Sequence, residues 1–72
     1  MLVHVKLFFH LRKYQDKNVE LADGSDATDL IRHLRIPLEE VGVLSINNQM
    51  ATLDQQLKAG DIITIIPPIG GG

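Results

Sequence analysis

Apolar and polar residues alternate at the start of the chain. Every second position of residues 2–10 is apolar, namely Val3, Val5, Leu7 and Phe9. The positions between them are mostly polar, and Phe8 is the exception that adds an apolar side chain to the second face. A period of two predicts a β-strand with one buried face.

The same alternation returns in a second, shorter segment at residues 18–22. Residues 11–17 between the two segments are polar and predict a connection with room for one helical turn. Two alternating segments joined in this way predict an antiparallel hairpin with a long loop. Asp23-Gly24 then supplies a turn signal.

The third segment has the spacing of an amphipathic helix. Its apolar positions follow i, i+3, i+4 and i+7, which places four side chains on one stripe: Ala27, Leu30, Ile31 and Leu34. Asp26 or Ser25 can cap the first N–H groups of this helix. Pro37 forces the helix to end at Ile36 or before, and residues 37–40 predict a further short turn.

Three more strands are expected in the second half of the chain, at residues 43–46, 50–53 and 62–66. Asn47-Asn48 suits a tight turn between the first two of these strands, because Asn tolerates a positive φ. Residues 54–57 resemble a single capped turn. Gly60 allows a break before the last segment, which is the most strand-prone run in the chain.

The element order ββαβββ places strands on both sides of one helix. This order predicts an α+β fold, with a mixed sheet of about five strands and one main helix across one face. The first and last strands are the most apolar, so we expect them to pair in the centre of the sheet.

Apolar side chains remain for the sheet face that the helix does not cover. Residues 62–66 are apolar on both faces, and Phe8 adds to the outer face of the first strand. We therefore expect a partner-binding patch formed by Phe8, Ile62, Thr64 and Ile66. The alternative is a set of isolated surface hydrophobic residues, which are common.

Composition narrows the class of protein. A length of 72 residues fits one domain, and 44% hydrophobic with 22% charged residues is a globular balance. The formal net charge of −2, without a basic cluster, argues against a nucleic-acid partner. No secretion signal is evident, and no apolar run approaches the ~20 residues that span a membrane. We expect a cytoplasmic protein without a membrane partner.

Metal and catalytic sites are not expected within the domain. The chain has no cysteine, so it can form neither a disulfide nor a thiolate metal site. His4, His10 and His33 lack the spacing of a preorganised metal site, and solvated surface histidines are the ordinary explanation. No group of residues resembles a catalytic constellation, so we expect no enzyme and no bound cofactor.

The last residues of the sequence have a composition of their own: Pro67, Pro68, Ile69, Gly70, Gly71 and Gly72. Proline cannot donate to a β-ladder, so the last strand ends at the prolines and the chain leaves the sheet stiffly. Glycines lack a Cβ and fit a narrow channel. We therefore expect a domain at residues 1–66 and a flexible tail at residues 67–72 that threads into a partner. A terminus without function is the alternative.

Several short runs together resemble the sulfur carriers of the molybdopterin synthase small subunit and thiamine sulfur carrier family. The resemblance runs nearly from end to end, through Val5–Phe9 with Leu11-Arg12, Leu21–Gly24 with Asp29–Ile31 and Leu34, Ile46-Asn47, Leu57, Gly60-Asp61, Ile65–Ile69 and Gly71-Gly72. The double proline and Phe8-Phe9 are similar to the molybdopterin type. Asn48 and Gly70 depart from the usual pattern, and the chain is shorter than many members of the molybdopterin type.

The resemblance implies a ubiquitin-like β-grasp fold and a carrier function. An adenylating enzyme related to the ubiquitin-activating enzymes is expected to thread Pro67–Gly71 and to adenylate the Gly72 carboxylate with ATP and Mg²⁺. A sulfur donor protein then converts Gly72 to a thiocarboxylate. This thiocarboxylate is expected to supply sulfur to a synthase partner, namely a molybdopterin synthase large subunit in molybdopterin or tungsten-pterin biosynthesis.

Two alternatives remain open at this stage. The first is the same chemistry with a thiazole synthase as partner, in thiamine biosynthesis. The second is a ubiquitin-like protein modifier or interaction module, in which Gly72 forms an isopeptide bond to a lysine. The tail that these functions require is the same, so the sequence does not separate them.

Overall fold

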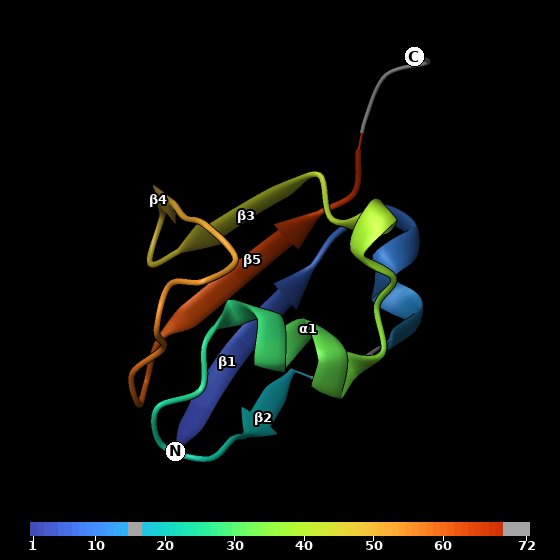
Figure 1. Cartoon of the computed structure of the whole chain (residues 1–72). Helices are drawn as coiled ribbons and strands as arrows, with labels where there is room; N and C mark the ends of the chain where they lie inside the picture. The colour runs from blue at the N-terminus through green and yellow to red at the C-terminus, as the bar shows by residue number, and fades with distance from the viewer. Residues whose placement is uncertain (15–16, 69–72) are drawn as a thin grey trace.

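The computed structural model describes residues 1–14 and 17–68, which fold into one mixed sheet with a helix across one face (Figure 1). The strands are β1 (Leu2–Leu7), β2 (Asn18–Glu20), β3 (Val43–Ile46), β4 (Gln49–Met50) and β5 (Ile62–Ile66). The helices are α1 (Ala27–Leu34) and the 3-10 helices η1 (Phe9–Tyr14) and η2 (Leu38–Glu40). The predicted order ββαβββ is confirmed.

The sheet has the strand order β2-β1-β5-β3-β4, so the first and last strands pair at its centre, as predicted. β1 and β5 are parallel, with Val5 opposite Ile63 and Leu7 opposite Ile65. The remaining pairs are antiparallel, including the predicted hairpin of β1 and β2. β5 is therefore hydrogen-bonded on both edges and has one face against α1.

The ends of α1 are fixed by local chemistry. Asp26 and Asp29 form a capping box, in which the Asp29 N–H donates to Asp26 Oδ1 at 2.9 Å and the Asp26 N–H donates to Asp29 Oδ2 at 3.0 Å. These bonds satisfy N–H groups that have no partner within the helix. At the other end, Arg35 takes a left-handed conformation with φ 62°, and its N–H donates to Arg32 O.

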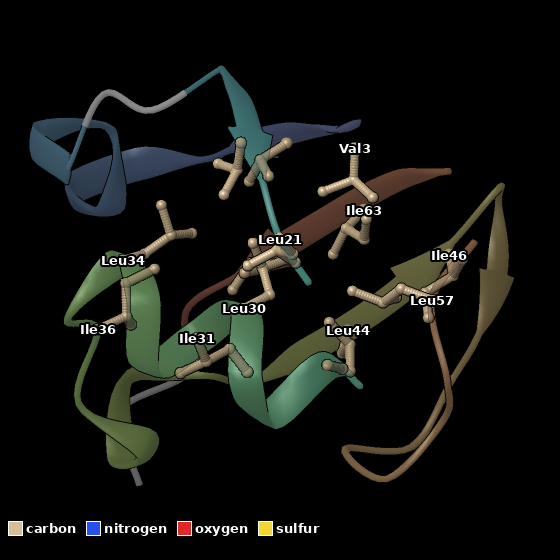
Figure 2. Close-up of a cluster of buried hydrophobic side chains, with 14 of the residues drawn as sticks. Val3, Leu21, Leu30, Ile31, Leu34, Ile36, Leu44, Ile46, Leu57 and Ile63 are labelled. Carbon is tan, nitrogen blue, oxygen red and sulfur yellow. The ribbon is translucent and has the colours of Figure 1, made fainter. Parts of the chain in front are cut away.

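The core lies between α1 and the inner face of the sheet (Figure 2). The four residues of the predicted helix stripe are all buried, and the inward residues of β5 are fully buried. The core members include Val3, Val5, Val19, Leu30, Ile31, Leu34, Leu44, Ile46, Ile63 and Ile65. No polar or charged residue is buried in the described part of the chain, so burial of apolar side chains stabilises the fold.

The first strand is shorter than predicted. β1 ends at Leu7, and Phe9 starts η1 with a positive φ of 53°. The prediction that Phe9 lies on the buried face is wrong, because its side chain is 62% exposed. Leu11 lies in a mostly polar run that was predicted to be a connection. In the structure Leu11 turns inward from η1 and is fully buried.

The loop between β3 and β5 also differs from its prediction. The turn at Asn47-Asn48 is confirmed, with φ of 53° and 69°. The returning strand β4 covers only Gln49–Met50, and no helical turn forms at residues 54–57. Residue Gln56 makes an isolated bridge to Asp26 instead, so this loop is held by the N-terminal end of α1.

The helices within residues 1–14 and 17–68 are short. None of them is long and apolar enough to cross a membrane.

Candidate functional site

The predicted patch residues lie together on the outer face of the sheet. In β5, Ile63 and Ile65 point inward, so the alternation of the strand turns Ile62, Thr64 and Ile66 outward. Ile62 is 39% exposed, and the other two side chains are half-buried. Phe8 directly follows the Leu7–Ile65 pair, its N–H donates to Ile65 O at 3.3 Å, and it is 42% exposed.

The apolar part of this face is concentrated at the end where β5 finishes. Val43 lies opposite Ile66 in the register of β3 and β5, and on the other side of β5 the Phe8 N–H is bonded to Ile65 O, the residue before Ile66. We call Phe8, Val43 and Ile66 the apical cluster. Sequence reasoning missed Val43, although its place before the buried Leu44 in an alternating strand already predicts an outward side chain.

A polar row separates the apical cluster from Ile62. Lys6 lies opposite Thr64 on one side, and Ser45 lies opposite Thr64 on the other. Ile62 itself is opposite His4. The outer face therefore offers an apolar contact at one end and hydrogen-bond donors across its middle, which is the mixed chemistry of a protein–protein contact surface.

An open groove borders Phe8 on the side of η1. It is lined by Lys6, Phe8, Phe9, Arg12 and Lys17, among other residues, so cationic and aromatic side chains line the same groove. The two rings are 6.4 Å apart at a tilted angle. Among the described residues, no ion pair involves any of these three cations. The groove thus places cationic side chains beside Phe8, a member of the apical cluster.

The 3-10 helices are joined through Tyr14 and Glu40. The Tyr14 hydroxyl donates to Glu40 Oε2 at 3.2 Å, and His10 Nε2 lies 3.3 Å from Glu40 Oε1. Burial of the phenol, and then its hydrogen bond to Glu40, raise the pKa of Tyr14 above its ordinary value of 10.0. This contact ties η1, which carries one border of the groove, to η2, which leads toward β3.

The exit of the chain from the sheet is held by Gly42. Its N–H donates to Ile66 O at 2.8 Å, one residue beyond the Val43–Ile66 pair. Pro67 is buried next to this bond, and Pro68 is exposed. The strand ends where prolines were expected to end it. The predicted tail residues Ile69, Gly70, Gly71 and Gly72 lie outside the described residues.

The histidines are dispersed in the structure. His4 Nδ1 is 2.5 Å from Asn18 Oδ1, and His10 faces Glu40. Within residues 1–14 and 17–68, no three His, Cys, Asp or Glu side chains are placed to hold a metal ion. The two contacts that these histidines make are the polar contacts of surface side chains.

A mixed five-stranded sheet with parallel central strands and one helix across one face defines a β-grasp, ubiquitin-like domain. The ThiS family model matches residues 5–72, so the chain belongs to the ThiS family. Among curated proteins, no sequence matches this chain significantly.

Solved structures of similar fold come from archaea and bacteria. The putative molybdopterin converting factor subunit 1 of Pyrococcus furiosus is 26% identical, with a TM-score of 0.77 over 94% of this chain and 98% of that chain. A complex of subunits 1 and 2 of the molybdopterin-converting factor of Helicobacter pylori gives 26% identity and a TM-score of 0.64 over both full chains. The small archaeal modifier protein 1 of Haloferax volcanii is 19% identical, with a TM-score of 0.78 over 94% of this chain and 98% of that chain.

Proposed function

We propose that this protein is a sulfur carrier whose C-terminal glycine, Gly72, is the site of chemistry. The observation that carries the proposal is the family match, which extends through the glycines to residue 72. The body at residues 1–66 docks on partners, and residues 67–72 form the tail that presents the carboxylate. The chain supplies a tethered substrate, and the catalytic groups belong to its partners.

The chemistry follows from the poor reactivity of a carboxylate. An oxygen of the Gly72 carboxylate attacks the α-phosphorus of ATP bound with Mg²⁺ by an adenylating enzyme, and pyrophosphate leaves. The resulting acyl-adenylate is an activated electrophile. Sulfur at the oxidation level of hydrosulfide, supplied by a sulfur donor protein, then attacks the acyl carbon, AMP leaves, and the product is a thiocarboxylate. The chain has no cysteine that could carry the sulfur as a persulfide, which supports Gly72 as the carrier group.

The residues before Gly72 suit passage of the tail through a narrow channel in a partner. A partner that brings ATP to a main-chain carboxylate needs a channel, and Gly70 and Gly71 have no Cβ to clash in it. Pro67 and Pro68 restrict the chain before this channel, and Ile69 is an apolar anchor between the two parts. The position of Pro67 and Pro68 beside Gly42 supports the role of the two prolines.

The outer face is the proposed docking surface for partners. Phe8, Ile62, Thr64 and Ile66 share this face, and the apical cluster lies next to the point where the tail begins. A partner that binds here is placed to receive residues 67–72 at once. The partners are the adenylating enzyme, the sulfur donor protein and a synthase subunit.

We assign the sulfur to molybdopterin or tungsten-pterin biosynthesis. Two of the similar structures, each 26% identical, bear the name of molybdopterin converting factor, and one of them is a complex of subunits 1 and 2. The double proline and Phe8-Phe9 agree with this assignment. A thiazole synthase is the alternative acceptor. A protein modifier is the second alternative, since attack of a lysine on the same adenylate would give an isopeptide bond.

Intact-mass measurement tests the proposal. The protein is incubated with ATP, Mg²⁺, a sulfur donor and the ubiquitin-activating-type enzyme of the same organism. Replacement of one oxygen by sulfur at Gly72 is expected, and lysine adducts would instead support a modifier. Removal of Gly72 is expected to abolish the mass change and to leave the melting temperature unchanged. No adenylation of the wild-type chain would contradict the proposal.

A further inference from the structure

Gly42 lies between η2 and β3, directly beside the end of β5. Figure 1 shows this arrangement, with the segment that leads into β3 next to the red end of β5. The Gly42 N–H supplies the last hydrogen bond to β5, through Ile66 O at 2.8 Å. After Ile66 the ladder cannot continue on the donor side of β5, because Pro67 has no N–H.

The reason for glycine at this position differs from the reason at the other described glycines. Gly24 and Gly60 have φ of +89° and +86°, and a Cβ on either would meet no atom within 4 Å. They are glycines because of their backbone conformation. At Gly42, by contrast, a Cβ would lie 2.5 Å from Pro68 N, 2.7 Å from Pro67 C and 2.7 Å from Pro68 Cα. Gly42 is required by close approach of two backbones.

The atoms that a Cβ would meet have little freedom to move. All three belong to the main chain of Pro67 and Pro68, where the proline rings hold φ near −65°. Ordinary van der Waals contact begins at 3.4 Å, so the 2.5 Å contact would have to open by about 0.9 Å. Either the prolines move away from β3, or the hydrogen bond from Gly42 to Ile66 is lost.

We propose that Gly42 is a positioning residue for the carrier reaction: it sets the path by which Pro67-Pro68 leaves the sheet, and thereby the point from which residues 69–72 reach a partner. This inference rests on the proposed function and adds to it a residue outside the tail. The path is fixed by three features that meet at one place, namely the absent Cβ, the last ladder hydrogen bond and the two proline rings.

In this role Gly42 affects how the tail presents its carboxylate and not how residues 1–66 bind a partner. Gly42 is on the opposite side of the Val43–Ile66 pair from Ile62, so a methyl group at residue 42 leaves the rest of the outer face in place. A displacement on the order of 1 Å at a reacting group lowers rates by up to ~10²-fold. Gly42→Ala is therefore expected to lower the kcat of adenylation roughly 10- to 100-fold and to change KM less than about threefold.

Adenylation is measured by ATP–pyrophosphate exchange with the ubiquitin-activating-type enzyme of the same organism. Gly24→Ala is the matched control, because it strains a positive φ without meeting any atom and lies far from the prolines in the sequence. It is expected to lower the melting temperature and to leave kcat unchanged. If Gly42→Ala lowers kcat no more than Gly24→Ala does, or raises only KM, the positioning role is overturned.

A second measurement tests the path itself without any partner. The chain has no cysteine, so Glu39→Cys gives a single site for a nitroxide label three residues before Gly42. Paramagnetic broadening of the Gly70–Gly72 amide signals is then compared between two labelled proteins, one with Gly42 and one with the Gly42→Ala substitution. A changed profile with unchanged core chemical shifts is expected, and an unchanged profile overturns the proposal.

Pro68→Gly covers the case in which Gly42→Ala does not fold. It leaves Gly42 in place and frees the φ that the ring of Pro68 restricts, so we expect an altered broadening profile, a lower kcat and an unchanged melting temperature. An unaltered profile or an unchanged kcat in this variant overturns the proposal. If the wild-type chain is not adenylated at all, the proposed function fails, whereas the label still reports whether Gly42 sets the path.

Discussion

The two faces of the central strand β5 contain the same residue type in different surroundings. On the inner face Ile63 and Ile65 are fully buried beneath α1. On the outer face Ile62 is 39% exposed and Ile66 is half-buried. Isoleucine on the inner face contributes to the free energy of folding, whereas isoleucine on the outer face is available to a partner. A single strand thus joins the stabilising surface to the proposed docking surface.

The difference in surroundings also explains why the two faces tolerate different chemistry. No polar or charged residue is buried in the described part of the inner core. On the outer face Lys6, Thr64 and Ser45 lie in one row across three strands. Water satisfies these polar groups in the free protein, and a partner can satisfy them in a complex.

The largest expected effect is on the inner face. Ile65→Ala leaves a cavity among the core residues and should lower the free energy of unfolding by about 2–5 kcal/mol. Ile62→Ala on the same strand is the matched control and should cost less than about 1 kcal/mol, because a partly exposed side chain loses less burial. Urea denaturation measures both values. Equal losses would show that the two faces do not differ in this way.

The next effect concerns the outer face. Phe8→Ala removes the aromatic member of the apical cluster, and the affinity for the adenylating enzyme should fall about tenfold, which corresponds to about 1.4 kcal/mol. Titration calorimetry with the wild-type tail present measures this affinity. Phe9→Ala is the control, because its ring is more exposed, at 62%, and lies outside the cluster. A larger loss of affinity in Phe9→Ala than in Phe8→Ala would show that the partner binds at the groove and not at the apical cluster.

A smaller effect is expected at the start of the helix that covers the inner face. Asp26→Ala removes the side-chain acceptor of the Asp29 N–H and should lower the free energy of unfolding by about 1 kcal/mol. Asp26→Asn keeps an acceptor and should recover most of this loss. Thermal denaturation compares the three proteins. A similar loss in both variants would indicate that the carboxylate charge, and not the hydrogen bond, stabilises this end of α1.

The smallest effect is a pH dependence at Tyr14, the only tyrosine of the chain. Its pKa is raised in the folded state, so its contribution to stability is fully present below the unfolded value of 10.0 and is lost as the pH rises through the folded value. Urea midpoints between about pH 9 and pH 11 should therefore fall more steeply for the wild type than for Tyr14→Phe. Parallel curves would contradict this assignment.

Local patterns in the sequence predicted most of the fold. The spacing of Ala27, Leu30, Ile31 and Leu34 identified the buried stripe of α1, and alternation identified β1 and β2. These predictions succeed because periodicity records which face of an element is buried. The turn at Asn47-Asn48 was also predicted correctly, because the positive φ of these residues is set by the local turn and not by distant contacts.

The features that the sequence did not predict depend on contacts between distant segments. Leu11 is buried because η1 folds back on the sheet, and the run of polar residues around it gives no sign of that packing. The role of Gly42 arises from Pro67 and Pro68, which lie far away in the sequence. Alternation predicts that Val43 points outward, and its place beside Ile66 comes from the pairing of β3 with β5.

The parallel pairing of β1 with β5 has a consequence for biosynthesis. The strand at the centre of the sheet is also the last strand of the described chain to be translated, so a nascent chain without residues 62–66 has an open gap between β1 and β3. Ile62 and Ile66, which belong to the proposed docking surface, arrive with that same strand. A partner that recognises the proposed docking surface would therefore not find that surface complete on a chain that ends before residue 62.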